Sequence, residues 1–146
     1  MTSSRSSSAR RNAEILATVS PGREEAVRHA FLHDSPEFPL LPELQPCPSE
    51  AVLEKITQPC FLGTPLDIAL RDCAINAFAI VGLALDVGIE PTVRHAADLG
   101  YIPVVVVDAC DGRDEGARQR ALAGLAFAGD DGITDTDTLC RALGGG

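Results

Sequence analysis

The sequence lacks the features that mark several classes of protein. No apolar run approaches the ~20 residues of a membrane-spanning helix, and the Ser- and Arg-rich start has no apolar segment typical of a secretory signal. Five cysteines occur without a CxxC pair, which argues against both a disulfide framework and a zinc site. We therefore expect a protein of the reducing cytoplasm, without a metal, another cofactor or a membrane partner.

Positive charge is also scarce. The chain has 12 Lys and Arg residues against 21 Asp and Glu residues, a net charge of −9, and Lys55 is its one lysine. Residues 1–30 carry five Arg and three Glu, so the remainder is strongly acidic. An acidic body disfavours nucleic acid and anionic membrane surfaces as partners.

The C-terminal part alternates between strand-like and helix-like segments. Helices are predicted over 64–73, 91–100, 114–128 and 135–143, and strands over 78–85, 102–110 and 132–134. The strands 78–85 and 102–110 are continuous apolar runs, which predicts that both faces of the sheet are covered. The alternation favours an α/β fold, a doubly wound parallel sheet with flanking helices, over 64–146.

The N-terminal part is less regular. Residues 1–12 are predicted to be a disordered tail, with a transit-like segment as the less favoured alternative. A short helix fits 9–19. Residues 13–63 otherwise form an irregular, proline-rich region that is long for a loop within a single domain.

In parallel α/β sheets, ligands bind beyond the carboxyl ends of the strands. This rule places the site at the loops 83–91 and 108–114, where Asp86 and Glu90 could form a polar rim. Gly88 lies where a buried strand turns into a helix, and a thiol there would be activated by the helix N-terminus. One interpretation is that Gly88 serves a positive φ or close packing. The other is that it occupies the position of a missing nucleophile.

The second interpretation rests on a resemblance. GLALDVGIEPTVRHAADLGY (82–101), followed by IPVVVVDAC (102–110), resembles the isochorismatase-like cysteine hydrolases, whose signature is roughly G-x-A-T-x-x-C-V-x-x-T-A-x-D-A. The likeness covers about 50–143. It implies a doubly wound parallel sheet, assembly into homo-oligomers, and hydrolysis of a small amide or related substrate by an Asp–Lys–Cys set.

Carried over by position, the resemblance places the nucleophilic cysteine at Gly88. It places the lysine at Lys55, because KITQPCFLGT resembles the family segment K-x-x-x-S-A-F-x-G-T. The backbone amides of Ala84 and Gly88 would hold an oxyanion, and a cis peptide bond would join Leu83 to Ala84. A solvated surface lysine is the alternative reading of Lys55.

The aspartate of that set has no counterpart in residues 1–54, so the N-terminal part of the fold is expected to be incomplete. Three hypotheses follow: a hydrolase by ancestry, a non-catalytic subunit for small-anion binding or assembly, and a truncated gene product. The partner in the first two would be a small-molecule substrate or anion.

Five further histidine and cysteine positions carry reactive side chains. His29 and His33 are four residues apart, with Asp34 adjacent, so on a helix they could bind a metal from one face; the surrounding sequence, however, is typical of a loop. His95 is predicted to be a solvated histidine on a helix surface. Cys60 could be a displaced nucleophile but more simply fits a small core or loop cysteine. Cys110 ends a buried strand and is predicted to be structural.

Overall fold

The computed structural model describes residues 40, 42–129 and 132–144. The predicted tail 1–12, the helix 9–19 and the His29–His33 pair lie outside these residues. The chain divides into two units, Met1–Glu50 and Ala51–Gly146. Between 42 and 63 the one regular element is a short 3-10 helix, η2, in the first unit. The domain boundaries inferred from the sequence stay a prediction.

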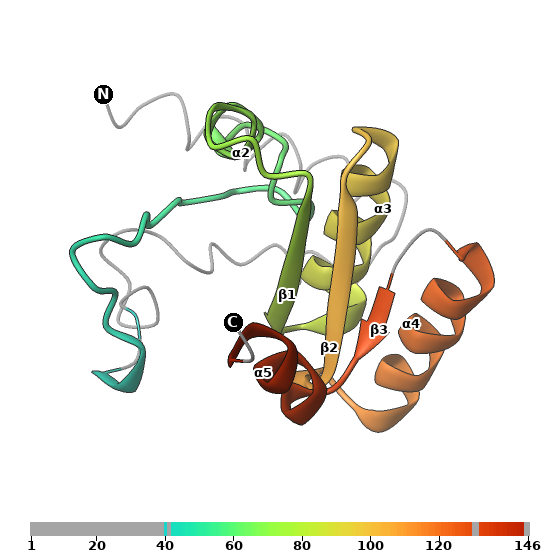
Figure 1. Cartoon of the computed structure of the whole chain (residues 1–146). Helices are drawn as coiled ribbons and strands as arrows, with labels where there is room; N and C mark the ends of the chain where they lie inside the picture. The colour runs from blue at the N-terminus through green and yellow to red at the C-terminus, as the bar shows by residue number, and fades with distance from the viewer. Residues whose placement is uncertain (1–39, 41, 130–131, 145–146) are drawn as a thin grey trace. The chain divides into compact units, whose positions relative to one another are not determined.

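The second unit alternates helices and strands along the chain (Figure 1). In chain order these are α2 (Leu66–Asp72), β1 (Ala77–Leu83), the π-helical turn η3 (Leu85–Ile89), α3 (Glu90–Asp98), β2 (Ile102–Asp111), α4 (Glu115–Ala128), β3 (Gly132–Thr134) and α5 (Thr136–Gly144), while the first unit contains η2 (Pro42–Leu44).

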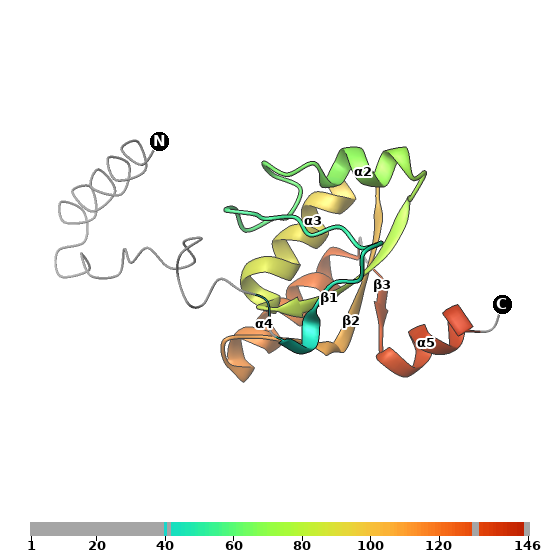
Figure 2. The same cartoon turned by 90° about the vertical axis from the view of Figure 1, so that its left-hand side faces the viewer.

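The three described strands form one parallel sheet in the order β1-β2-β3. Ala77 pairs with Ile102 at the start of β1, and the register shifts after Ile80. Figures 1 and 2 both place α3 and α4 on one face of the sheet and α5 on the other. This arrangement confirms the predicted α/β fold with a parallel sheet and flanking helices.

Two clusters of buried side chains hold the unit together. The first lies between the sheet and the helices α3 and α4, and its members are Leu85, Ile89, Val93, Val105, Cys110, Ala121 and Leu125. The second surrounds Phe61 and Tyr101 near the amino ends of the strands, where Leu66 and Leu70 of α2 pack against it. From α4, the side chains of Ala121 and Leu125 are buried in the first cluster.

The prediction that both faces are covered holds for β2 but is wrong for β1. Consecutive residues Val105 and Val106 of β2 are both buried. Along β1, exposed and partly buried residues alternate, and Val81 is 55% and Leu83 is 78% exposed. The reason is packing: β1 is an outer strand of the described sheet, and α5, the helix on the face opposite α3 and α4, packs against β2.

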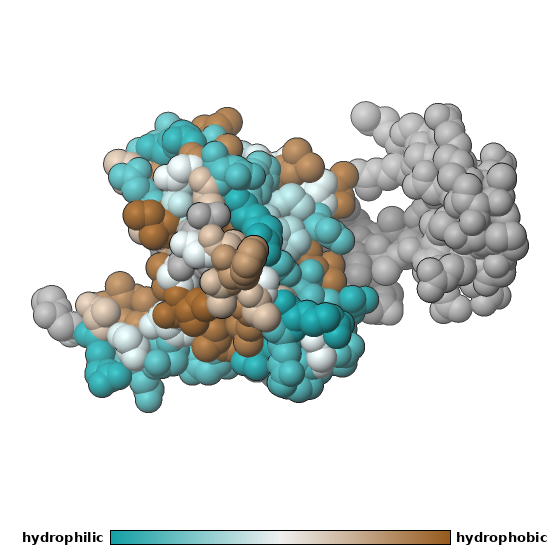
Figure 3. Space-filling view, turned by 90° about the vertical axis from the view of Figure 1, so that its right-hand side faces the viewer, coloured by the Kyte–Doolittle hydropathy of each residue, from teal (hydrophilic) through white to brown (hydrophobic). Residues whose placement is uncertain are grey.

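Helix α2 contacts the second cluster along a narrow stripe. Leu66 and Leu70 pack against the cluster, whereas Ala69 and Cys73 are exposed. On the α4 side of the molecule, Figure 3 shows apolar side chains gathered among polar ones. The large apolar residues exposed in α4 and β3 are Phe127, at 93%, and Ile133, at 50%.

Local signals fix the ends of α4. The Asp114 side chain accepts a hydrogen bond from the Ala117 amide at 2.8 Å, which caps the N-terminus. Gly129, with φ 70°, adopts the left-handed conformation that ends the helix.

None of the helices in the described ranges has the length and apolar character needed to cross a membrane.

Candidate functional site

The structure brings together the two residues that the sequence singled out. A Cβ atom built on Gly88 would lie 4.0 Å from Nζ of Lys55 and 3.9 Å from the carbonyl oxygen of Leu83. The two residues are 33 positions apart in the sequence, so tertiary structure creates this proximity. It occurs at the carboxyl end of β1, where ligands bind in parallel sheets.

Neither the backbone nor packing requires a glycine at position 88. Its φ lies outside the positive range that favours glycine, and the neighbours of a built Cβ are at ordinary van der Waals distance. The interpretation that Gly88 serves a positive φ or close packing is therefore wrong. A side chain would fit here, and its direction would point toward the Lys55 ammonium.

The turn that carries Gly88 has an unusual backbone. The peptide bond between Leu83 and Ala84 is cis, as the resemblance implied. In η3 the amides of Val87, Gly88 and Ile89 all approach the Ala84 carbonyl, and the Gly88 amide donates to it at 2.8 Å. A ligand that used the Gly88 amide would have to share this donor.

Lys55 is exposed, but its ammonium is held by its own loop. Nζ donates hydrogen bonds to the carbonyls of Thr57, at 2.9 Å, and Gln58, at 3.1 Å. The Thr57 hydroxyl in turn contacts the carbonyls of Pro59 and Leu62, at 3.0 and 2.8 Å. An ammonium has three donor hydrogens; two are used within the loop, and among the described residues the third has no partner, so it can serve a ligand.

The two acids that flank Gly88 are neutralised by arginines. Asp86 pairs with Arg113 at 2.9 Å, and Glu90 pairs with Arg94 at 2.8 Å. Asp86 is thereby linked to the β2–α4 loop, and its Oδ1 atom is buried without a hydrogen-bond partner among the described residues. These ion pairs reduce the negative charge that a bound anion would meet at this end of the sheet.

The nearby cysteines do not replace the missing thiol. Cys110 is buried, its Sγ lies 3.8 Å from the Ile80 carbonyl, and burial raises its pKa, so the neutral thiol is favoured. Cys60 packs against the second cluster, as expected for a small core residue. His95 differs from the prediction: it is half-buried, and its ring meets the edge of Phe61 at 5.8 Å.

Sequence reasoning missed Thr92. This residue of α3 is 2% exposed, and its hydroxyl donates to the Gly88 carbonyl at 2.7 Å and accepts from the Cys60 amide at 3.1 Å. Thr92 occupies the second Thr of the signature quoted above, and that position could have identified it.

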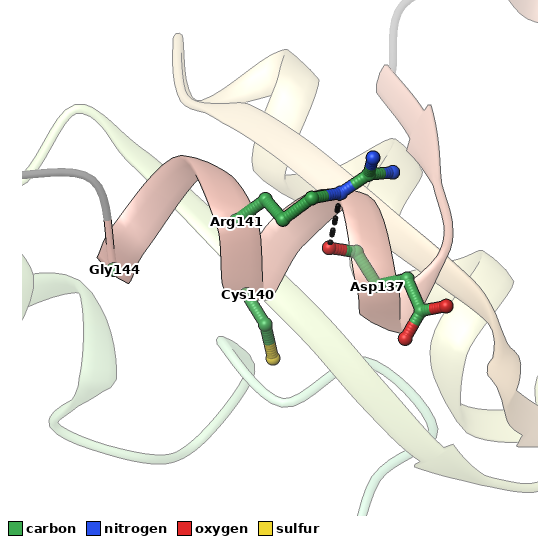
Figure 4. A pocket seen from close by; sticks show the side chains of 4 residues that line it. All are labelled: Asp137, Cys140, Arg141 and Gly144. Atoms are coloured by element: carbon green, nitrogen blue, oxygen red, sulfur yellow. Dashed lines mark hydrogen bonds between the residues drawn. The ribbon is translucent and has the colours of Figure 1, made fainter.

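A hollow on α5 lies apart from this site. It is open and is lined by Asp137, Cys140, Arg141 and Gly144, and Figure 4 shows Arg141 donating to the Asp137 carbonyl of the same helix, at 3.2 Å. Within the described ranges, no group of three His, Cys, Asp or Glu residues is arranged to hold a metal ion.

Comparison with known proteins places this geometry in a family. A sequence model of the isochorismatase domain matches residues 7–137. The chain belongs to the isochorismatase family. The match begins far upstream of residue 50, where the resemblance was expected to start, so most of the irregular N-terminal region belongs to it.

Solved structures of the family share the fold. An isochorismatase family protein from Desulfovibrio vulgaris has 27% identity and a TM-score of 0.69, over 76% of this chain and 58% of its own. One from Burkholderia thailandensis has 32% identity and a TM-score of 0.61, over 65% and 50%. A nicotinamidase from Staphylococcus aureus has 30% identity and a TM-score of 0.53, over 56% and 52%. This isochorismatase family chain therefore spans between half and three fifths of the length of these relatives.

Proposed function

We propose that this protein binds a small carboxylate or amide between Lys55 and Gly88 and that it does not hydrolyse it through a cysteine. The observation that carries the proposal is the open position at Gly88, with Nζ of Lys55 4.0 Å from a built Cβ. In the family pattern a thiol would occupy this position. Without it, covalent acyl transfer has no nucleophile at this point, while the cation that would attract a polar ligand is retained.

The chemistry of the site favours a small, negatively polarised group. The third hydrogen of the Lys55 ammonium can donate to a carboxylate or a carbonyl oxygen, and such charge-assisted bonds are the stronger kind. The pairing of Asp86 and Glu90 with arginines removes the nearest repulsion. Nicotinamidases are among the family structures that this chain resembles, so nicotinate and nicotinamide are suitable probes.

Calorimetric titration of the full chain with nicotinate, nicotinamide and acetate tests the proposal. We expect saturable binding of at least one probe, loss of that binding in Lys55→Gln, and retained binding in Arg141→Gln, which removes an exposed cation from α5. Nicotinamide should not be hydrolysed by the wild-type chain in a coupled ammonia assay. Binding that is equal in Lys55→Gln and the wild type would exclude this site, and sustained ammonia release would exclude the non-hydrolytic assignment.

Assembly is the second candidate function, because the uncovered face of β1 is apolar. Val81 is 55% exposed, and Ile102 of β2, which pairs with Ala77 and lies on the same face, is 59% exposed. In the described sheet β1 is an outer strand without charged residues, and such a strand is a surface on which a second copy can pack or pair. We propose a homo-oligomer that uses this face. Sedimentation should show an oligomer that dissociates in Val81→Glu and persists in Phe127→Glu, whereas a monomeric wild type would contradict the idea.

A further inference from the structure

Thr92 connects the two halves of the proposed site. Its side chain is buried, with 2% of its surface exposed. Its hydroxyl donates a hydrogen bond to the Gly88 carbonyl, at 2.7 Å, and accepts one from the Cys60 amide, at 3.1 Å. A threonine in a helix often bonds the carbonyl four residues back, but the bond from an amide 32 positions away is a tertiary contact.

The bond to Cys60 anchors the loop that carries Lys55. Nζ of Lys55 is bonded to the carbonyls of Thr57 and Gln58, and the Thr57 hydroxyl is bonded to the carbonyls of Pro59 and Leu62. Hydrogen bonds within the loop from 55 to 62 thus hold the loop and the ammonium together. Cys60 lies within it, so a single hydroxyl links this loop to the backbone of Gly88.

We propose that Thr92 is the positioning residue that holds the Lys55 ammonium over position 88. The inference rests on the proposed function, because it assigns a role only if Lys55 and Gly88 form one site. The competing explanation is that apolar packing alone fixes the loop. Phe61, next to Cys60, is 7% exposed and stacks on Tyr101 with ring centroids 5.5 Å apart.

A thiol introduced at position 88 reports on the ammonium, because a nearby cation favours the thiolate. In Gly88→Cys, alkylation of that thiol is followed against pH by site-resolved mass spectrometry. Adding Thr92→Val removes the hydroxyl but keeps the shape, and we expect roughly a tenfold lower alkylation rate at pH 7 as the thiol returns toward its ordinary pKa of about 8.5. Adding Thr92→Ser keeps both hydrogen bonds and should restore the rate. Thr136→Val, at the start of α5, is the matched control and should have no effect.

The outcomes separate the two proposals. If the thiol of Gly88→Cys alone titrates like an ordinary cysteine, the Lys55–Gly88 site itself fails. If that thiol is activated and Thr92→Val leaves its rate unchanged while the protein stays folded, only the role of Thr92 is overturned. Hydrogen exchange of the wild-type chain gives a test that does not depend on folding of the valine variant. The Cys60 amide should exchange as slowly as the core amides of α3, and fast exchange would overturn the proposal.

Discussion

Restoring a cysteine at position 88 is the sharpest test of the site. The change Gly88→Cys introduces a thiol whose Cβ lies 4.0 Å from Nζ of Lys55, without a clash and without an unfavourable φ. At about 5 Å and an effective dielectric constant of about 40, the attraction between thiolate and ammonium is about 1.7 kcal/mol. Since one pKa unit corresponds to about 1.4 kcal/mol, the pKa should fall from about 8.5 to about 7.3.

The assay follows from this magnitude. At pH 7 the thiolate fraction should rise from about 3% to about 33%, so alkylation should be roughly tenfold faster than for an ordinary thiol. Site-resolved mass spectrometry reads the introduced thiol beside Cys140, which is exposed and serves as an internal reference. Adding Lys55→Met should return the pKa toward 8.5, and raising the salt concentration should weaken the effect.

The reasoning is refuted if the introduced thiol titrates near the ordinary value of about 8.5 and is insensitive to Lys55→Met. In that case the ammonium would not act at position 88 in solution, and Lys55 could not be the cation that binds the proposed ligand. A depressed pKa that survives Lys55→Met would instead assign the activation to the helix N-terminus.

Three further predictions concern stability. Leu125→Ala, at a fully buried position, should lower the free energy of unfolding in urea by about 3 kcal/mol, whereas Phe127→Ala on the exposed side of the same helix should change it by less than about 0.5 kcal/mol. The Tyr101 hydroxyl, at 2.8 Å, holds the pKa of Asp67 below its usual range. The ionised carboxylate therefore adds stability above about pH 4 that is lost as the pH falls further, and Asp67→Asn should flatten the acid limb of a stability-against-pH curve. Asp114→Ala should cost about 1 kcal/mol by removing the cap of α4, and Asp114→Asn should cost much less; equal losses would show that the cap is not the cause.

The order of elements followed from local patterns. Pro91 and Gly100 bracket α3, and Asp114 and Gly129 bracket α4, because capping chemistry acts within a few residues. The apolar runs of β1 and β2 indicated strands, and their alternation with helices indicated a parallel sheet. What local pattern could not show is that β1 is an outer strand among those that the structure describes, since strand order is set by pairing between distant segments.

For the site, the sequence determined which residues to compare: a lone lysine, and a glycine at the turn from sheet to helix. The tertiary structure decided that they are neighbours, that Gly88 meets neither a strained φ nor a crowded Cβ, and that Thr92 joins their two segments. The physical reason is that a hydrogen bond across 32 residues and a contact across 33 depend on how α3 packs against the loop from 55 to 62. The spacing of residues along the chain does not predict that packing.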